Sequence, residues 1–353
     1  MLSYHNTLIE PLMPSKIHSR FGDEIDTSVD LNGIKLDIPI ISSPMDSINN
    51  PEFFVELRKL GGIGIIHRFM GIDAQINIWK AVNYKLRIYS NEALNEKIPD
   101  PPAIMAIGIN GDWIKRFDLH YKDGVRHFLI DIANGFCEDI VKVIKTCREH
   151  DCWVMAGNVA SAPGYKYLDK LGVNAVRVGI GTGSACTTRK MTGIGYPMLS
   201  ALQGCNQEKN GTYTNFTKES FIIGGDCSAA IVADGGIKEP SDMVKALFCG
   251  ADAVMMGYAF ASCVESSPGL KLGSTRVYRG MASFAAQRDA GKAPRTAEGE
   301  EFPIKVDKTL EEIMSSYEGG LRSAMSYLNS NMVSEMKEGG NLITVPSNMR
   351  EGY

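Results

Sequence analysis

Short apolar runs recur along the chain, and each ends in or is followed by glycine, aspartate, asparagine or serine. The runs are continuously apolar rather than alternating, which is what a strand covered on both faces requires. We predict eight such strands, at residues 38–43, 62–67, 103–109, 127–131, 152–156, 175–180, 229–234 and 253–257.

Amphipathic stretches of helical period lie between these runs, most clearly at 51–60, 137–150, 162–171 and 239–249. Asn50 before Pro51 is a typical start of a helix. Eight strands alternating with helices predict one (β/α)8 TIM barrel over residues 1–353. An open, doubly wound sheet is the alternative that this pattern leaves open.

Two polar stretches depart from the repeat. Residues 204–226 are rich in glycine and predict an extended surface excursion before the seventh strand. Residues 280–310 carry scattered Gly and Pro, and we expect a mobile active-site lid at about 283–310. The tail after Ser330 is weakly patterned, so we expect it to fray.

Composition and charge argue against nucleic acid and membranes as partners. The 353 residues carry a net charge of -4, which gives no basic field for nucleic acid. There is no apolar run of about 18 residues to cross a membrane, and the N-terminus has no secretory pattern. We therefore expect a cytoplasmic enzyme that acts on a small molecule. The eight cysteines show no CxxC spacing, which argues against zinc and favours mostly structural thiols.

One cysteine stands in a different context. The loop after the sixth expected strand reads GIGTGSACTTRK, so Cys186 lies among glycines and just before Arg189 and Lys190. A thiol in an electropositive loop loses its proton more readily and becomes a nucleophile. On spacing alone, a tight turn with an incidental cysteine remains equally open.

The next two expected strands end in glycine turns. Asp234 is followed by Gly235 and Gly236, and the last strand leads into Gly257 and Tyr258. A carboxylate can bind a sugar diol, and exposed N–H groups of such turns suit phosphate. Phosphate sites after strands seven and eight recur in barrels. Each turn alone could be an ordinary glycine turn without a binding role. The two turns in this order favour a nucleotide-binding site.

At this point the residues resemble a known family. The string GIGTGSACTTRKMTGIGYP is similar to the catalytic loop shared by IMP dehydrogenases and GMP reductases, and the similarity continues through SSPMDS, GGIGIIH, AGNV, ADGGI, GADAVMMG, YRGMAS and EGGLRSAMSY. It covers nearly the whole chain. The resemblance implies the (β/α)8 barrel, a homotetramer, and GMP or IMP as ligand.

The resemblance also assigns roles to residues. Cys186 would attack purine C2 and form a thioimidate, and K⁺ would be held at Gly181, Gly183, Cys186 and Arg189. The substrate would be bound by Ser184, Asp234, Gly235, Gly236, Gly257, Tyr258, Tyr278, Gly280, Met281, Ala282, Arg295 and Gly299. The nicotinamide cofactor would be bound by Ser19, Arg20, Arg68, Asp131, Ile132, Ala133, Ile180 and Gly181.

The lid distinguishes the two enzymes of the family. A dehydrogenase uses an Arg-Tyr pair on a long flap to activate water, and the segment between Ser283 and Glu298 contains no such pair. Its RTAEGE resembles the RASEGK of GMP reductases, in which the Glu and a Thr after the Cys protonate departing ammonia. Here these would be Glu298 and Thr188, and an amine leaves only when it is protonated.

Other features bear on the same choice. DIANGFCEDIVKVIK resembles the reductase sequence DVANGYSEHFVEFVK, and the gap from His67 to Ala103 has no room for the CBS modules that most dehydrogenases carry. We therefore expect a GMP reductase that uses NADPH. The strings SSPMD and YRGMAS are closer to those of dehydrogenases. Thr182 stands where the family usually has Pro in the catalytic loop, and Tyr258 stands where it often has Gly at the phosphate. A CBS-less IMP dehydrogenase using NAD is the alternative, and a catalytically silent nucleotide-binding homologue is the third possibility.

Overall fold

Eight parallel strands form the centre of the molecule. The computed structural model describes residues 1–12, 14–22, 24–92, 100–214, 220–222, 225–266, 269–289, 293, 296–337 and 340–346. The strands pair in the order β4-β13-β12-β9-β8-β7-β6-β5, and a bridge between Ile41 and Ile63 joins the two ends of the sheet. The predicted (β/α)8 barrel is therefore confirmed, and each expected strand is present: β4 (Ile40–Ser42), β5 (Ile65–Ile66), β6 (Ile104–Ile107), β7 (His127–Asp131), β8 (Trp153–Val159), β9 (Ala175–Val178), β12 (Ala230–Asp234) and β13 (Ala253–Met256).

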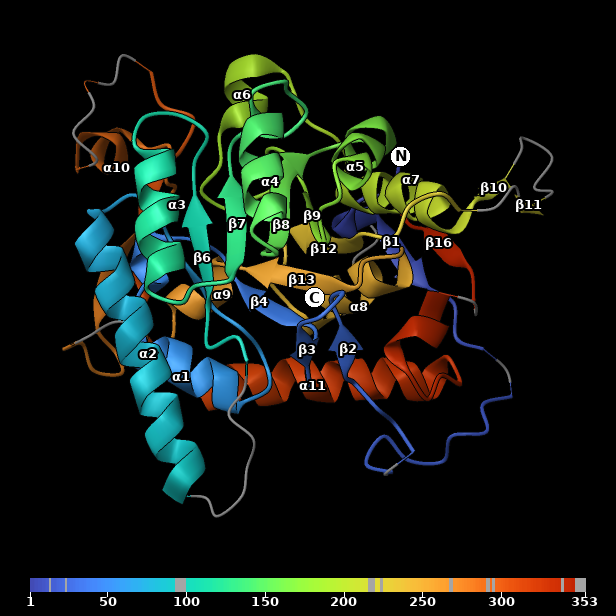
Figure 1. Cartoon of the computed structure of the whole chain (residues 1–353). Coiled ribbons are helices and arrows are strands. Elements are labelled where there is room, and N and C mark those ends of the chain that lie inside the picture. Colours follow the sequence, from blue (N-terminus) through green and yellow to red (C-terminus); the bar gives the residue numbers. More distant parts are fainter. Residues whose placement is uncertain are drawn as a thin grey trace.

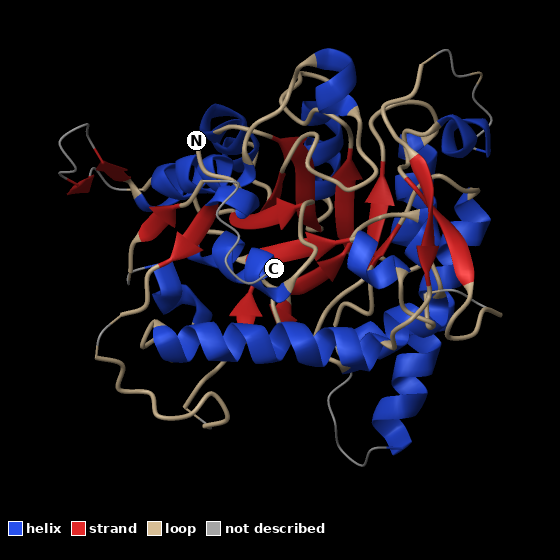
Figure 2. Ribbon diagram, turned by 180° about the vertical axis from the view of Figure 1, so that it is seen from behind, coloured by secondary structure: helices blue, strands red, loops and turns tan. Residues whose placement is uncertain are grey.

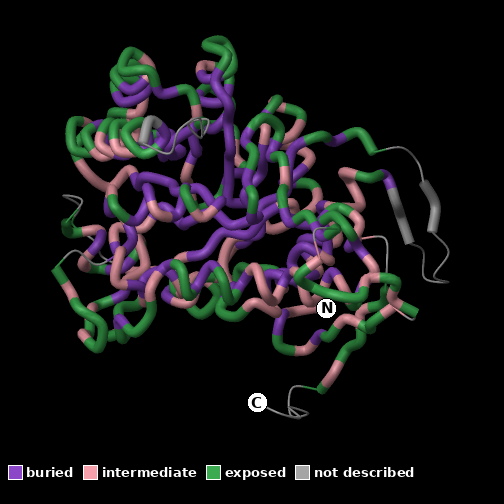
Figure 3. Tube along the Cα trace, turned by 90° about the horizontal axis from the view of Figure 1, so that it is seen from below, coloured by how far each residue is buried: buried purple, intermediate pink, exposed green. Residues whose placement is uncertain are grey.

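Alternate residues of these strands face two separate cores. In β7, Leu129 belongs to the cluster inside the barrel, whereas Phe128 and Ile130 pack against the surrounding helices. Both sets are fully buried, and buried residues gather around the central strands in Figure 3. This two-sided burial explains why the strands read as continuous apolar runs.

Helices surround the barrel (Figure 1). Asn50 accepts a hydrogen bond from the Glu52 N–H at the start of α1, with Pro51 in the first turn, as the sequence indicates. The longer helices are α1 (Pro51–Lys59), α2 (Ile72–Glu92), α3 (Trp113–Lys122), α4 (Ile140–Glu149), α5 (Ala162–Lys170), α7 (Met198–Asn210), α8 (Pro240–Phe248) and α11 (Leu310–Tyr327). The shorter ones are α6 (Thr188–Thr192), α9 (Tyr258–Ala261), α10 (Phe284–Asp289), η1 (Tyr4–Asn6), η2 (Asp46–Ile48) and η3 (Val333–Lys337).

A small hairpin closes one end of the barrel. Strands β2 (Val29–Asp30) and β3 (Lys35–Leu36) pair antiparallel, and the connecting Leu31 and Ile34 are fully buried in the inner core. The indole Nε1 of Trp153, at the start of β8, donates a hydrogen bond of 3.0 Å to the Leu31 carbonyl. The hairpin fills the end at which the strands begin, so the opposite end is the one available for chemistry.

The structure differs from the sequence expectations in two segments. Residues 204–210 continue α7, where Leu199, Leu202 and Cys205 are buried at helical spacing, and a hairpin of β10 (Thr212–Thr214) and β11 (Ser220–Ile222) follows. The expected fraying of the tail is wrong at 333–337 and 342–344. There η3 forms, and β16 (Leu342–Thr344) pairs with β1 (Thr7–Ile9), one of the two-stranded sheets outside the barrel in Figure 2. That pairing joins the two ends of the chain, which no local pattern reveals.

Among the described helices, none combines the length and apolar composition needed to cross a bilayer.

Candidate active site

A pocket of about 550 Å³ opens at the carboxyl ends of the barrel strands. Its walls come from the loops after several strands, from Tyr278 of β14 (Thr275–Arg279) and from residues between β14 and β15 (Glu301–Lys305). It brings together most of the residues singled out in the sequence: Arg68, Asp131, Ile132, Ala133, Ile180, Gly181, Gly183, Ser184, Cys186, Thr188, Asp234, Gly235, Gly236, Gly257, Tyr258, Tyr278, Gly280, Met281, Ala282 and Glu298.

The predicted catalytic residues form a connected row. The Sγ of Cys186 lies 3.2 Å from the Thr188 hydroxyl, and this hydroxyl donates a hydrogen bond of 2.7 Å to Glu298 Oε2. Because the hydroxyl proton is directed at Glu298, the hydroxyl oxygen is available to accept the thiol proton. The row can therefore carry a proton between the sulfur and the carboxylate.

Backbone hydrogen bonds attach the lid to the catalytic loop. The Thr187 N–H donates to the Glu298 carbonyl at 2.9 Å, the Glu300 N–H donates to the Ala185 carbonyl at 2.8 Å, and Cys186 forms an antiparallel bridge with Gly299. The position of Glu298 is thus set by main-chain contacts next to Cys186, not by its side chain alone.

Two glycines permit this close approach. A Cβ at Gly280 would lie 2.9 Å from the Ala185 carbonyl oxygen, and one at Gly299 would lie 2.9 Å from the Ser283 nitrogen. Three backbone segments meet here, from the catalytic loop, the turn after β14 and the lid. Any larger residue would separate them.

The remaining cysteines have a different environment. Six of them are buried, and burial raises the pKa of each thiol, to about 11 for Cys152 and to about 12 for Cys205 and Cys249. Cys186 and Cys137 are partly exposed. Only Cys186 of these two lines the pocket, so the geometry favours it as the nucleophile.

A row of charged side chains crosses the floor of the pocket. Arg177 donates to Asp131 Oδ1 at 2.6 Å and to Asp234 Oδ2 at 2.9 Å, while Arg68 Nε lies 3.3 Å from Asp131 Oδ2. Burial alone lowers the pKa of the Arg177 guanidinium, but the charges of Asp234 and Asp131 raise it above its ordinary value. Asn158 adds a hydrogen bond of 2.7 Å to Asp234 Oδ2.

The sequence patterns had not singled out Asn158 or Arg177. Arg177 stands inside the apolar run of β9, and Asn158 stands near the end of β8. The sequence did hold one signal for Arg177, which is that a cation stands within a buried strand. An arginine in that position needs anionic partners, and this could have pointed to a cluster of charges. Met45 and Phe69, which also line the pocket, gave no chemical signal in advance.

The glycine turn after β12 has a backbone conformation that favours glycine. Gly235 and Gly236 both have positive φ, at 91° and 80°. A Cβ at Gly235 would lie 2.6 Å from Thr182 Oγ1, so this turn packs directly on the catalytic loop. Tyr258 meets Tyr278 edge to face at 5.6 Å, and both contact Phe302 of β15.

The catalytic loop is held in a tight bend. Gly181 has φ of 71°, and a Cβ there would lie 2.5 Å from Cγ of Arg189. Thr182, which departs from the usual proline, donates a hydrogen bond of 2.6 Å to the Asp234 carbonyl. This hydroxyl ties the loop to the end of β12 in a way that a proline could not.

Some expected residues lie elsewhere. Ser19 and Arg20 are on a loop held by Arg322, which donates to the carbonyls of Arg20, Gly22 and Ile25, and they do not line the pocket. Arg189 does not line the pocket, and its side chain donates to the Tyr196 carbonyl. Arg295 falls outside the described residues.

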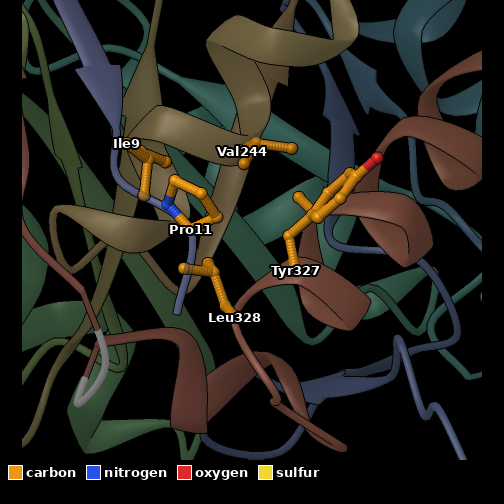
Figure 4. A pocket seen from close by; sticks show the side chains of 6 residues that line it. Ile9, Pro11, Val244, Tyr327 and Leu328 are labelled. Carbon is orange, nitrogen blue, oxygen red and sulfur yellow. The ribbon is translucent and has the colours of Figure 1, made fainter. Parts of the chain in front are cut away.

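A second hollow of about 290 Å³ lies between β1, α8 and α11 (Figure 4). Apart from the Tyr327 hydroxyl, its side chains are apolar: Ile9, Pro11, Val244, Ala324 and Leu328. Apart from that hydroxyl, it offers no group for acid, base or nucleophilic chemistry. Within the described residues, no three His, Cys, Asp or Glu side chains gather as a metal site either.

Comparison with known proteins agrees with this geometry. The model of the IMP dehydrogenase / GMP reductase domain matches residues 1–352. The chain is 30% identical to an inosine-5'-monophosphate dehydrogenase of Cryptosporidium parvum, covering 91% of this chain and 87% of that protein. It is 30% identical to the enzyme of that name from Borreliella burgdorferi, covering 97% and 94%. It is 32% identical to a GMP reductase of Buchnera aphidicola, covering 87% and 83%.

Proposed function

Because the chain belongs to the IMP dehydrogenase/GMP reductase family, we propose that it is a GMP reductase, which converts GMP and NADPH to IMP and ammonia. One observation carries this choice within the family. Glu298 is hydrogen-bonded to Thr188, which lies against the Cys186 sulfur. A proton donor is needed there if an amine is to leave, and the pocket offers it.

The deamination half of the reaction uses only residues of this row. The Cys186 sulfur forms a bond to purine C2, and its proton passes through the Thr188 hydroxyl to Glu298. Glu298 returns that proton to the exocyclic amine, the C2–N bond breaks, and ammonia departs. A thioimidate between Cys186 and C2 remains. The thiol proton thus ends on ammonia, and no water is consumed.

The second half needs a hydride donor. NADPH would supply hydride to C2, the C–S bond would break, and the Cys186 thiolate would take up one proton to complete IMP. Asp131, Ile132 and Ala133 would hold this cofactor, with Arg68 as the cation toward its phosphates. The fit is supported by Arg68, which lines the pocket with a partly exposed side chain while bound to Asp131. The lid contacts at 298–300 would keep water away from the thioimidate.

The nucleotide would lie between these groups. Asp234 would bind the ribose hydroxyls, and Ser184, Gly235, Gly236, Gly257, Tyr258 and Tyr278 would surround the phosphate. Gly280, Met281 and Ala282, with Arg295 and Gly299 from the lid, would contact the base. Tyr278 fits this role, because its hydroxyl is buried in the pocket wall with a thioether, Met45 Sδ at 3.4 Å, as partner.

A K⁺ ion would be held by carbonyl oxygens of the catalytic loop at Gly181, Gly183, Cys186 and Arg189. The tight bend that brings Gly181 against Arg189 fits a ring of carbonyls of this kind. Such an ion would supply charge that keeps the loop bent. The homotetramer and the cytoplasmic location are further parts of the proposal. Light scattering of the purified protein would test the first, and activation by added KCl would test the ion.

One assay tests the activity. Purified protein is mixed with GMP and NADPH, and separately with IMP and NAD, and absorbance of the reduced nicotinamide is followed. We expect consumption of NADPH with GMP. Formation of NADH with IMP, without consumption of NADPH, would show that the reductase assignment is wrong.

A CBS-less IMP dehydrogenase using NAD is the second candidate, and relatives of that name at 26–34% identity favour it. It would have to hydrolyse the same thioimidate, so it needs a base for water in place of the Glu298 row. Tight nucleotide binding without turnover in either assay would favour the silent homologue.

A further inference from the structure

Arg177 stands between two carboxylates that belong to different ligands in the proposed function. Its Nη1 donates to Asp131 Oδ1 at 2.6 Å, and its Nε donates to Asp234 Oδ2 at 2.9 Å. Asp131 is assigned to the dinucleotide and Asp234 to the ribose of the nucleotide. One guanidinium therefore touches both halves of the site.

Arg177 binds one oxygen of each carboxylate. Arg177 and Asn158 both donate to Oδ2 of Asp234, and Arg177 holds Oδ1 of Asp131 while Arg68 approaches its Oδ2. The Arg177 side chain is 10% exposed, and each aspartate is 14% exposed. Two carboxylates this well buried repel each other strongly unless a cation lies between them.

We infer that Arg177 is a positioning residue for both ligands, which orients the ribose-binding Asp234 and the dinucleotide-binding Asp131 through a single planar fork. The identity of the two ligands rests on the proposed function, but the shared dependence rests on the observed hydrogen bonds. Loss of Arg177 should therefore weaken the binding of both ligands. An ordinary contact residue would affect only its own ligand.

The neighbours of Arg177 provide matched controls. Arg68 forms an ion pair with Asp131 and none with Asp234, so Arg68→Met should weaken dinucleotide binding alone. Asn158 donates to Asp234 and to the Gly179 carbonyl, so Asn158→Ala should weaken nucleotide binding alone. Arg177→Met removes both hydrogen bonds with similar volume. Arg177→Lys keeps the charge but loses the fork.

The experiment measures binding without chemistry, so every protein in it carries Cys186→Ala and cannot form the thioimidate. The parent protein with Cys186→Ala alone serves as the wild type in this comparison. Calorimetry gives the dissociation constant of GMP for the free protein, and then that of NADP⁺ for protein saturated with GMP, a pair that cannot exchange hydride. Hydrogen bonds to charged groups are worth enough to change an affinity roughly tenfold to a hundredfold. We expect both constants to rise by about that factor in Arg177→Met and by less in Arg177→Lys.

A merely structural role would give a different result. A partly unfolded Arg177→Met protein would bind fewer equivalents of ligand, but its folded fraction would keep the wild-type constants. The number of sites and the melting temperature are therefore recorded for every variant. Arg177→Lys supplies the same comparison if Arg177→Met does not fold.

The outcomes separate the two hypotheses. A rise in only one constant, or in neither, for Arg177→Met and Arg177→Lys would overturn the role of Arg177. If the wild type binds XMP and NAD⁺ in place of GMP and NADP⁺, the reductase assignment fails, and the same comparison on that pair still decides about Arg177. Wild-type protein that binds neither pair would overturn both.

Discussion

The hydroxyl of Thr188 donates a hydrogen bond to Oε2 of Glu298 across 2.7 Å, between residues 110 positions apart in the chain. Glu298 stays in place because its own carbonyl and the Glu300 N–H pair with the backbone of the catalytic loop. The proposed acid for the leaving group is therefore held by the backbone pairing that lies next to Cys186.

The first prediction concerns that acid. Glu298→Gln keeps the shape and an oxygen that can accept from Thr188, but it cannot hold and return a proton. We expect the turnover of GMP to fall by about 10²–10⁴, the usual contribution of general acid catalysis, while calorimetry gives a nearly unchanged affinity for GMP.

Glu300→Gln is the matched control, because Glu300 lies on the same lid segment and its side chain pairs with the exposed Lys190. Its turnover should remain at the wild-type rate. Equal rates for Glu298→Gln and wild type would remove Glu298 from the proton path.

The second prediction concerns the nucleophile. Cys186→Ala should abolish turnover, because no other thiol lines the described pocket. Mass spectrometry of denatured wild-type protein after mixing with GMP should show a covalent adduct that Cys186→Ala lacks. Cys137→Ala, which removes the other partly exposed thiol, should keep both activity and adduct. A fully active Cys186→Ala protein would contradict covalent catalysis.

Much of the barrel could be predicted from the sequence because its strands are buried on both faces. Residues such as Phe128 and Leu129 are apolar whichever way they point, so each strand is visible as a local run. The end of α7 and the pairing of β16 with β1 were not visible. The end of α7 carries polar residues on its surface, which obscure the helical pattern. The pairing of β16 with β1 brings together residues far apart in the chain, such as Leu8 and Ile343.

The candidate site was predictable only where a motif carried it. Cys186, Asp234 and the glycine turns stand in recognisable strings. The role of Arg177 is visible only once β9 lies next to β12 in the sheet and β7 lies one strand further on, beyond β8. Its partners Asp131 and Asp234 are separated from it by 46 and 57 positions. A single sequence gives no distance of this kind.

The third prediction concerns stability against pH. Burial lowers the pKa of both His67 and His120 to about 4, whereas a histidine in the unfolded chain has a pKa of about 6.5. The unfolded state therefore takes up protons first, and the stability that these residues contribute is present above pH 6.5 and is lost as pH falls toward 4. Each should account for on the order of 3 kcal/mol across that interval.

Urea unfolding at several pH values in this interval measures the effect. In His120→Gln, the free energy of unfolding should fall less steeply with acid than in the wild type, because one buried titrating group is gone. The Nδ1 of His120 is buried without a described partner, so no hydrogen bond at that atom offsets the substitution. Identical slopes in the two proteins would show that His120 does not titrate as described.

The fourth prediction concerns the contact between the phosphate turn and the catalytic loop. Gly235 has φ of 91°, and a Cβ there would lie 2.6 Å from Thr182 Oγ1 and 2.8 Å from the Gly183 nitrogen. In Gly235→Ala, the methyl group must push the loop that carries Cys186. Since displacements of about 1 Å can cost roughly a hundredfold in rate, we expect a loss of that order in kcat/KM for GMP. Gly273→Ala is the control: Gly273 has φ of 90° but nothing within 4 Å of an added Cβ, and it does not line the pocket. It should lose about 1–2 kcal/mol of stability from backbone strain and keep its activity. Similar kinetic losses in both variants would mean that strain alone, and not the contact with the loop, explains the effect at Gly235.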